Sequence, residues 1–362
     1  MINVIKVKLK NRSYDILVGY NILPKLGEFL KQLGIGTDAY IITNALLKKK
    51  YGASLVKTLK GSHFSYRHKI VADTEASKSM RMATDILKDI ASHDKKKRFF
   101  IVALGGGVIG DLAGFVASVY KRGVAYIQVP TSLLAQIDSS IGGKTGVDLA
   151  QGKNLVGAFY QPRLVLSDVR FLSTLSQRQL ITGLAEAIKY GIIKDKELFV
   201  YLEKNFKEIL ALKPSALAFI VSRCSRIKAD IVGKDEKEEK GIRTILNFGH
   251  TIGHAIEAAG GFKAYNHGEA VALGMLVASN ISRSLCLIDD RTCARIENLI
   301  RAVGLPFKIM GVSFTRIILA HYHDKKFIGK KNRFVLTCGI GKTKIVENLP
   351  LAIIRKALQK RK

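Results

Sequence analysis

The sequence has 362 residues, of which 48% are hydrophobic and 24% charged, and its formal net charge is +30. This length exceeds what one hydrophobic core usually holds, so we expect two domains of ordinary globular composition. No apolar run reaches transmembrane length, which excludes a membrane span. The four cysteines show no C-x-x-C spacing and no signal peptide precedes them, so a disulfide framework is excluded and a cytoplasmic protein is expected.

The positive charge raises the question of a nucleic-acid partner, because clustered lysines neutralise phosphates. The basic clusters 48–50, 95–98 and 360–362 are typical of solvated helix ends and loops, and the chain has no tryptophan. No aromatic residues interleave with basic ones in a ladder. We therefore expect nucleic acid to bind only non-specifically, through net charge.

The first half of the chain alternates between strand and helix patterns. Residues 2–9 and 13–18 alternate like two strands of a hairpin. Further strand patterns lie at 39–43, 68–72, 99–104, 126–130 and 163–168, with helical patterns from about 45, over 78–91 and after 104, and an irregular stretch at 131–154. Short strands that alternate with helices predict an open, mostly parallel, Rossmann-like sheet covered on both faces.

Helical periodicity dominates from 175 to about 320, with polar breaks near 213–214, 234–240 and 260–266. The segment 333–341 predicts one late strand pair, and 351–360 predicts a final helix. The expected fold is therefore an α/β N-terminal domain over residues 1–174, followed by a mostly α-helical C-terminal domain over 175–362.

A glycine-rich loop joins a strand pattern to a helix pattern in LGGGVIGDLAGF, where Gly105, Gly107 and Gly110 are spaced as G-x-G-x-x-G. In this context backbone amides cradle a pyrophosphate. No acidic residue lies between Asp111 and Asp138, where a ribose-binding carboxylate would be expected. A dinucleotide, a simple phosphate and a tight turn with Asp111 as helix cap all remain open at this point.

A second candidate is DSSIGGKTGVDLAQGKN, which gathers Asp138, Lys144, Asp148, Lys153 and Asn154 among glycines. Glycine permits close backbone approach, and lysine and asparagine donate to phosphate esters. Long irregular loops inside compact domains are usually functional, although a flexible surface loop has the same composition.

A third candidate resembles a metal site. The segment NFGHTIGHAIE places His250, His254 and Glu257 on one helical face, and His267 follows in NHGEAVALG. Glu186 lies three residues before Lys189 on another helix pattern. Spacing alone selects His250 and His254 as the ligand pair, by analogy with H-E-x-x-H, whereas buried core histidines are the alternative.

Six long segments carry a resemblance to one family. They are GGGVIGDLAGF, YKRGVAYIQVPTSLLAQIDSSIGGKTGVD, GKNLVGAFYQP, GLAEAIKYG, NFGHTIGHAIE and NHGEAVALG. Together they closely resemble the 3-dehydroquinate synthase family, whose fold is also used by glycerol dehydrogenases and other sugar-phosphate cyclases. The resemblance implies a shikimate-pathway lyase that uses NAD and one divalent ion, zinc or cobalt. It would convert 3-deoxy-D-arabino-heptulosonate 7-phosphate to 3-dehydroquinate and phosphate by transient oxidation, phosphate elimination, reduction and intramolecular aldol closure.

The resemblance also implies site residues. It replaces the spacing-based metal pair with Glu186, His250 and His267, and leaves His254 beside the substrate. The implied substrate and catalytic residues are Lys144, Asn154, Lys189, Lys228, Arg243, Asn247, His254 and Lys325 or Lys326, with Arg122 reaching the partner's site in a homodimer. The implied NAD environment is Asn44, Asp73, Glu75, Lys78, Gly106, Gly107, Val108, Ile109, Gly110, Asp111, Thr131, Ser132, Asp138, Lys144, Lys153, Phe171, Leu172, Ser173 and Thr174.

Two further expectations concern specificity. Arg243 lies one helical turn before Asn247 and two before His250, so on a continuous helix it would face the metal side and meet the substrate carboxylate. The segment EKEEKGIR has one residue more than the family spacing, which leaves Glu238 and Glu239 as alternatives for an acidic position. A sister cyclase or an NAD-dependent polyol dehydrogenase of the same fold is the alternative function.

Overall fold

The computed structural model describes residues 1–94, 98–322 and 332–362. By contacts the chain forms two compact units, Met1–Leu175 with Leu217–Lys237, and Ser176–Ala216 with Glu238–Lys362. The first break lies beside the predicted boundary at residue 174. Most of helix α7 (Pro214–Lys234), which the sequence placed in the second domain, belongs to the first unit. The assignment of cofactor and metal to separate domains stays a prediction.

The first unit is built on a seven-stranded sheet with the order β1-β2-β9-β6-β5-β3-β4. Its strands are β1 (Asn3–Val7), β2 (Tyr14–Gly19), β3 (Asp38–Thr43), β4 (Ser65–Ile70), β5 (Phe99–Gly105), β6 (Tyr126–Pro130) and β9 (Leu164–Asp168). Only the β1–β2 hairpin is antiparallel, and the other strand pairs of this sheet are parallel. The predicted hairpin and mostly parallel sheet are confirmed.

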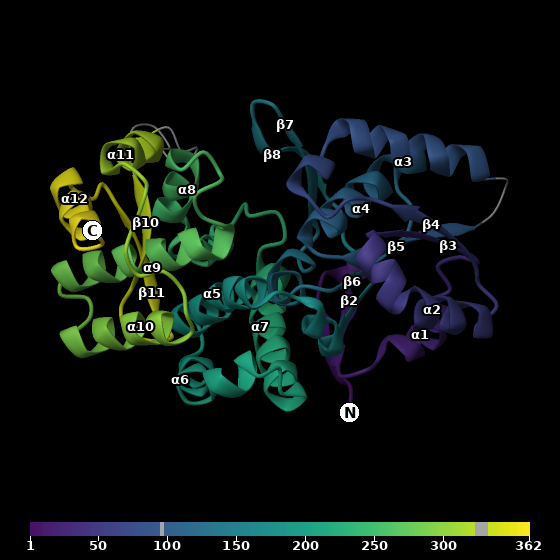
Figure 1. The fold of residues 1–362 in the computed structure, drawn as a ribbon, viewed down its shortest axis with the longest axis horizontal. Helices are drawn as coiled ribbons and strands as arrows, with labels where there is room; N and C mark the ends of the chain where they lie inside the picture. The colour runs from purple at the N-terminus through teal and green to yellow at the C-terminus, as the bar shows by residue number, and fades with distance from the viewer. Residues whose placement is uncertain (95–97, 323–331) are drawn as a thin grey trace. The chain divides into compact units, whose positions relative to one another are not determined.

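Helices cover both faces of this sheet, as Figure 1 shows. Helices α1 (Leu26–Leu33) and α2 (Ala45–Gly61) pack on one face, and α3 (Met80–His93) and α4 (Gly107–Val119) pack on the other. Successive strand residues point to opposite faces, so Ile41 joins the α1–α2 cluster and Ile42 joins the α3–α4 cluster. Burial of both faces explains why the inner strands β3, β5, β6 and β9 are mostly apolar, whereas the edge strands β1 and β4 are partly exposed and more polar.

The predicted irregular stretch at 131–154 is wrong in its second half, which forms a hairpin of β7 (Lys144–Leu149) and β8 (Gly152–Phe159). Gly146 is opposite Gly157, and a Cβ on Gly157 would come within 2.2 Å of the Thr145 carbonyl oxygen. These glycines permit close strand pairing, but in a sequence they indicate a loop. A turn of π-helix, Ala135–Ser139, precedes the hairpin.

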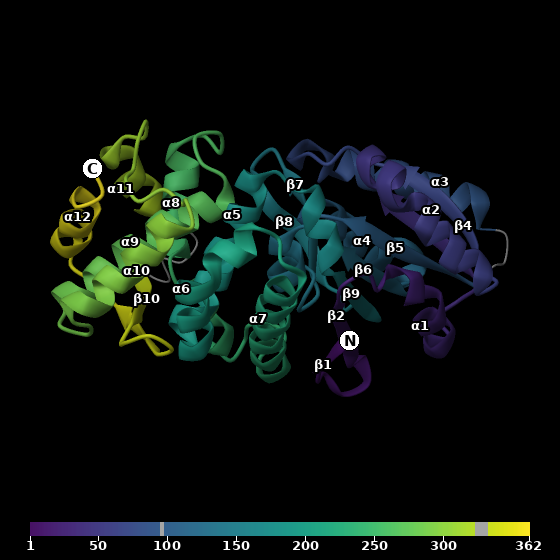
Figure 2. The same ribbon diagram turned by 60° about the horizontal axis from the view of Figure 1, so that its bottom comes forward.

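The second unit is mostly helical, as expected. It contains α5 (Gln177–Ile193), α6 (Lys196–Leu210), α8 (His250–Ala259), α9 (His267–Ser284), α10 (Asp290–Ala302), α11 (Phe314–Tyr322), α12 (Leu351–Gln359) and the hairpin of β10 (Arg333–Thr337) and β11 (Thr343–Glu347). Helix α9 is its central element, and it contacts α5, α8, α10, α12 and β10 (Figure 2). The late strand pair and the final helix are confirmed.

Glycines bring α5, α8 and α9 together at backbone distance. A Cβ on Gly268 would lie 2.1 Å from the Thr182 carbonyl oxygen, and one on Gly274 would lie 1.9 Å from the Gly249 carbonyl oxygen. Gly249 itself is left-handed, with φ 80°, and it ends the short 3-10 helix η7 (Ile242–Asn247) before α8 begins. Larger residues at these positions would push the helices apart.

Candidate active site

The predicted NAD residues gather at one edge of the parallel sheet. They follow the carboxyl ends of β3 (Asn44), β4 (Asp73, Glu75 and Lys78), β5 (Gly106 to Asp111), β6 (Thr131 and Ser132) and β9 (Phe171 to Thr174). Asn44 Nδ2 donates to Asp73 Oδ2 at 3.1 Å, and Gly106 lies beside Ser132 and Asp73. Ligands of open α/β sheets bind at this edge.

The glycine loop gives α4 an open amino terminus. Gly106 is the N-cap residue and, as a glycine, has no side chain that could accept from the first-turn amides. These amides and the helix dipole together suit a pyrophosphate. A Cβ on Gly105 would lie 2.6 Å from Ile109 Cβ, whereas a Cβ on Gly106 would meet nothing closer than 3.6 Å. Gly105 therefore permits the turn, and Gly106 leaves space in front of it.

A buried lysine connects this edge to the β7–β8 hairpin. Lys78 Nζ donates to Asp111 Oδ2 at 2.6 Å and also to Asn154 Oδ1. Lys153 Nζ lies 3.2 Å from Glu75 Oε1. Burial raises the pKa of Asp111 to about 6 despite the opposing Lys78 ammonium. The structure thus brings Lys78, Asp111, Lys153 and Asn154 together within the first unit.

Other predicted residues of the first unit have different surroundings. Lys228 Nζ, on α7, donates to Asp138 Oδ1 at 2.6 Å and to the Asp138 carbonyl at 2.8 Å. Phe171 and Leu172 are core residues, so only their backbone is available to a ligand. Lys144, at the start of β7, and Arg122, in the 3-10 turn Tyr120–Arg122, are exposed.

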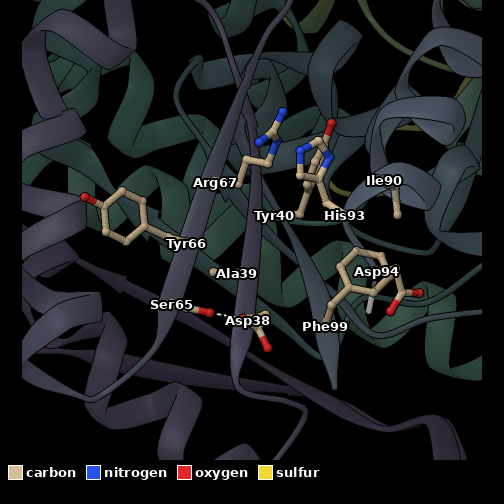
Figure 3. Close-up of a pocket in the computed structure, with 10 residues that line it drawn as sticks. All are labelled: Asp38, Ala39, Tyr40, Ser65, Tyr66, Arg67, Ile90, His93, Asp94 and Phe99. Atoms are coloured by element: carbon tan, nitrogen blue, oxygen red, sulfur yellow. Dashed lines mark hydrogen bonds between the residues drawn. The ribbon is translucent and has the colours of Figure 1, made fainter. Parts of the chain in front are cut away.

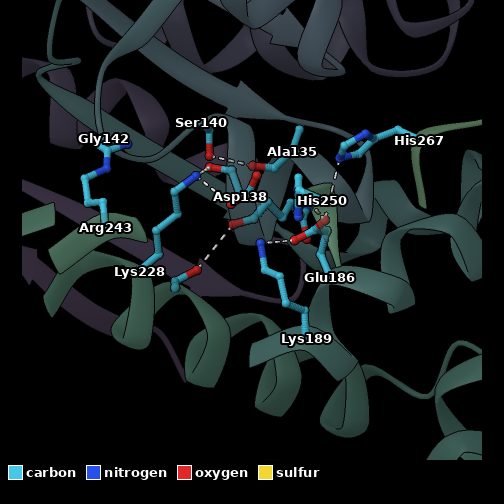
Figure 4. A network of polar contacts seen from close by, with 12 residues as sticks. Ala135, Asp138, Ser140, Gly142, Glu186, Lys189, Lys228, Arg243, His250 and His267 are labelled. Atoms are coloured by element: carbon cyan, nitrogen blue, oxygen red, sulfur yellow. Dashed lines mark hydrogen bonds and ion pairs between the residues drawn. The ribbon is translucent and has the colours of Figure 1, made fainter. Parts of the chain in front are cut away.

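The predicted metal ligands meet around one buried carboxylate in the second unit (Figure 4). Glu186 is fully buried on α5, His250 is the first residue of α8 and His267 is the first residue of α9. The Nε2 atoms of His250 and His267 lie 3.5 and 3.6 Å from Glu186 Oε1. Lys189, one turn along α5, forms an ion pair with Glu186 Oε2.

Electrostatics prepare this cluster for a cation. Burial alone would raise the pKa of Glu186, but Lys189 and the two imidazoles lower it well below its ordinary value, so the carboxylate is ionised. Burial and Lys189 lower the pKa of His250, which leaves the ring neutral. Burial opposes a proton on His267, yet Glu186 and Glu257 raise its pKa to about 10. Without an ion, a proton on His267 compensates the carboxylates.

A divalent ion fits these residues. Both Glu186 oxygens are buried and neither makes a hydrogen bond, so the Lys189 ion pair on Oε2 and the two imidazoles near Oε1 compensate the charge, and coordination to an ion would add to this. One ligand atom from each of Glu186, His250 and His267 lies within 4.8 Å of the others. A carboxylate and two imidazoles form a ligand set of catalytic zinc sites and leave coordination positions open. A second trio, His254, Glu257 and His267, meets the same criterion and shares His267.

The expected continuous helix from Arg243 to His250 is wrong, because Gly249 separates η7 from α8. Arg243 is nevertheless buried, and its Nε lies 3.2 Å from Glu238 Oε1, so Glu238 rather than Glu239 is paired with it. Asn247 ends η7, and the His254 ring lies 5.4 Å from the His250 ring. Lys325 and Lys326 lie outside the described residues.

A separate cavity of about 280 Å³ lies at the opposite edge of the sheet (Figure 3). The amino ends of β3, β4 and β5 form its floor, and the end of α3 forms its wall. Arg67 donates to Asp89, which also accepts from Tyr40. The residues drawn in Figure 3 include none of the predicted site residues, and parallel sheets bind ligands at the other edge.

Glu257 adjoins the candidate metal site, although the sequence-based prediction did not include it among the site residues. The signal was present, because Glu257 lies seven residues after His250 and thus on the same face of α8. Glu257 Oε2 lies 3.5 Å from His267 Nδ1.

Across the described part of the chain, no helix combines the length and apolarity that a bilayer span requires.

Known structures define the class of this fold. The 2-epi-5-epi-valiolone synthase of Streptomyces hygroscopicus subsp. jinggangensis, solved with NAD+ and Zn2+, matches with a TM-score of 0.88 and 27% identity over 97% of both chains. A 2-deoxy-scyllo-inosose synthase, solved with carbaglucose-6-phosphate, NAD+ and Co2+, matches with a TM-score of 0.89 and 26% identity over 99% of this chain and 100% of that one. The fold is that of sugar-phosphate cyclases.

Sequence comparison identifies the family. Models described as 3-dehydroquinate synthase N-terminal and C-terminal match residues 68–182 and 183–327. The 3-dehydroquinate synthase of Thermoanaerobacter sp. is 46% identical over 342 residues, which are 94% of this chain and 96% of that protein. The chain belongs to the 3-dehydroquinate synthase family, a family of lyases.

Proposed function

We propose that this chain converts 3-deoxy-D-arabino-heptulosonate 7-phosphate to 3-dehydroquinate and phosphate, as a shikimate-pathway enzyme on the route to chorismate and the aromatic amino acids. The observation that carries the proposal is the cluster of His250 and His267 around the buried Glu186 in a chain of this family. When bound, NAD would accept a hydride from the substrate and later return it, and the divalent ion would lower the pKa of the alcohol that is oxidised.

The chain's own residues hold these groups and the substrate. Glu186, His250 and His267 would hold zinc or cobalt, and the amides after Gly106 would hold the NAD pyrophosphate. Asn44, Asp73, Thr131, Ser132 and the backbone of Phe171 to Thr174 would surround the rest of NAD, together with Glu75, Lys78, Asp111, Asp138, Lys144 and Lys153. The β5, β6 and β9 ends support this assignment, because they lie at the ligand-binding edge.

Substrate residues supply charge and position. Lys144, Asn154 and Lys325 or Lys326 would bind the phosphate, and Lys228 and Arg243 would bind the carboxylate. Lys189, Asn247 and His254 would bind hydroxyl groups near the metal. Rigid positioning supplies much of the rate, since the substrate's own groups undergo elimination and aldol closure once it is held.

Phosphate release tests the proposal and separates it from its alternatives. Metal-loaded protein should release phosphate from the heptulosonate phosphate only when NAD is present. NADH should not accumulate, since the hydride is returned within each turnover. Stoichiometric NADH formation would favour a polyol dehydrogenase, and turnover of a sugar phosphate without a carboxylate would favour a sister cyclase.

The oligomeric state is a second part of the proposal. We propose a cytoplasmic homodimer in which Arg122 completes the neighbouring site, and nucleic acid binds only non-specifically. The exposed position of Arg122 is compatible with a contact to the partner subunit. Mixed Arg122→Ala and Lys144→Ala subunits should regain part of the activity, because each heterodimer contains one intact site. Exchanged subunits that remain inactive would argue against a shared site.

A further inference from the structure

Two carboxylates face opposite sides of one imidazole. His267 Nε2 lies 3.6 Å from Glu186 Oε1, and His267 Nδ1 lies 3.5 Å from Glu257 Oε2. An imidazole that binds a metal through one nitrogen has the other nitrogen protonated and available as a donor. The two carboxylates therefore have different tasks, one beside the ion and one behind the ring.

Burial distinguishes the two carboxylates. The Glu186 side chain is completely buried, and Oε1, the oxygen that faces both imidazoles, makes no hydrogen bond, whereas Oε2 pairs with Lys189. The Glu257 side chain is 12% exposed, and the His267 side chain between the two carboxylates is 34% exposed. An ionised group in the buried position has more to gain from a cation, because less water solvates it.

His250 repeats the same arrangement. Its Nε2 faces Glu186, and its Nδ1 lies 3.2 Å from the carbonyl oxygen of Phe248. Both imidazoles thus turn Nε2 toward Glu186 and Nδ1 toward an acceptor outside the cluster. For His250 the acceptor is a neutral carbonyl, whereas for His267 it is the carboxylate of Glu257. A carboxylate behind a metal-bound histidine fixes the ring and makes it a stronger ligand.

We infer that Glu257 is a positioning residue for the metal site: it accepts from His267 Nδ1–H, fixes the ring with Nε2 toward the ion, and does not bind the ion itself. The inference rests on the proposed function, which assigns the ion to Glu186, His250 and His267. It also explains the overlap of the second trio, because Glu257 and His254 adjoin the site without forming another one. His254 then keeps the substrate role proposed above.

Metal binding tests this without substrate. Full-length Glu257→Gln, Glu257→Ala and Glu186→Gln proteins would be stripped and titrated with Co2+ against a competing chelator. Ion stoichiometry and the visible Co2+ absorption would be recorded. Glu269→Gln is the matched control, because Glu269 lies two residues after His267 and caps α9 through Asn266, a task that glutamine also performs. The ion pair that it loses is with the largely exposed Arg178, so little stability should be lost with it. Thermal unfolding of each apo protein would report folding.

We expect one ion per chain and unchanged affinity in Glu269→Gln. Glu257→Ala should weaken binding by about 10–100-fold, the usual effect of losing such a partner, with Glu257→Gln less affected because its amide oxygen still accepts. Both Glu257 variants should shift the Co2+ absorption, and Glu186→Gln should lose detectable binding. Unchanged affinity and spectrum in Glu257→Ala would overturn the inference.

Three other results would also overturn it. Loss of binding in Glu257→Ala with retention in Glu186→Gln would make Glu257 an inner ligand. Two ions per wild-type chain would turn the second trio into a site of its own. A wild-type chain that binds no divalent ion would refute the metal assignment itself. If the ion binds as expected but phosphate is not released, the proposed function fails while the role of Glu257 stands.

Discussion

The candidate NAD edge and the candidate metal cluster are constructed on opposite principles. At the NAD edge the backbone is the main ligand, through strand ends and an uncapped α4, and the charged side chains around it pair with one another, as Lys78 does with Asp111. In the metal cluster the ligands would be side chains, gathered around Glu186, which pairs with Lys189 and faces two imidazoles. The first arrangement relies on backbone groups, whereas the second relies on buried charges that compensate one another.

This difference predicts different sensitivities to substitution. A backbone site tolerates most side-chain changes and fails where a new Cβ blocks the approach of a ligand. A buried side-chain site fails when any one ligand is lost, because the remaining charges stay buried without compensation. The predictions below test this contrast, from the largest expected effect to the smallest.

Loss of a metal ligand should have the largest effect. His250→Ala should release the ion and lower turnover by more than the roughly 100-fold that outer-shell changes cost. His254→Ala should retain the ion but turn over poorly. Atomic emission and phosphate release would measure both. An ion that is lost from His254→Ala and retained in His267→Ala would contradict the ligand assignment and break the contrast.

Loss of the buried arginine should be the next largest effect. Arg243→Ala should cost about 2–5 kcal/mol in transition-state stabilisation, the range for losing one member of a buried charge pair. Arg243→Lys keeps the charge without the two-pronged geometry, so it should fall between Arg243→Ala and wild type. Ratios of kcat/KM would measure this. Sedoheptulose 7-phosphate, which lacks the carboxylate, should be a very poor substrate; its efficient cyclisation would refute the assignment.

The NAD edge should show the burial of Asp111 as a pH effect on stability. The pKa of Asp111 is raised from 3.8 to about 6, chiefly by burial, so the ionised form is disfavoured in the folded state. Below about pH 4 the Asp111 carboxyl is protonated in both the folded and the unfolded state and does not lower stability. As the pH rises through 6, burial of the ionised carboxylate should lower the free energy of unfolding by about 1–3 kcal/mol. Asp111→Asn should remove that loss, so the variant should gain relative to wild type between pH 4.5 and 7.5.

Chemical denaturation of the NAD-free proteins at both pH values would measure this difference. The charged neighbours Lys78, Glu75 and Lys228 are present in both proteins, so the comparison isolates the change at Asp111. An unchanged difference between variant and wild type over this range would show that Asp111 is ionised without penalty.

Two adjacent glycines give the smallest and sharpest comparison. Gly105→Ala should destabilise the fold by about 1–3 kcal/mol, because its Cβ would overlap Ile109. Gly106→Ala should leave stability unchanged, since Gly106 has φ −75° and open space, but it should weaken NAD binding. Thermal unfolding and NAD titration would separate the two. Unaltered NAD affinity in Gly106→Ala would mean that this face of the loop does not meet the cofactor.

The sequence predicted the fold best where one pattern had one physical cause. Buried parallel strands are apolar on both faces, and the helix breaks at 213–214 and 260–266 carry proline or glycine. The β7–β8 hairpin was missed because the glycines that bring its strands close also indicate a loop. The break at Gly249 was missed because glycine within an apolar helical pattern is compatible with a continuous helix.

The residues that surround the candidate metal site were harder to predict than the helices on which they lie. Helical spacing placed His250, His254 and Glu257 on one face, but it ranked His254 above His267, which is on another helix. Contacts between helices far apart in the sequence decide such cases, and periodicity within one helix contains no information about them. The family resemblance supplied Glu186 and His267, whereas the position of Glu257 behind His267 required three-dimensional coordinates.

The glycine contacts among α5, α8 and α9 bear on ion selection. Because these helices touch at backbone distance, they cannot slide to adjust the separation of Glu186, His250 and His267. A larger ion would then have to distort side chains rather than shift a helix. If these residues hold the ion as proposed, discrimination among divalent ions would depend on the interhelical spacing, and a larger residue in place of one of these glycines should change the preferred ionic radius while every proposed ligand is kept.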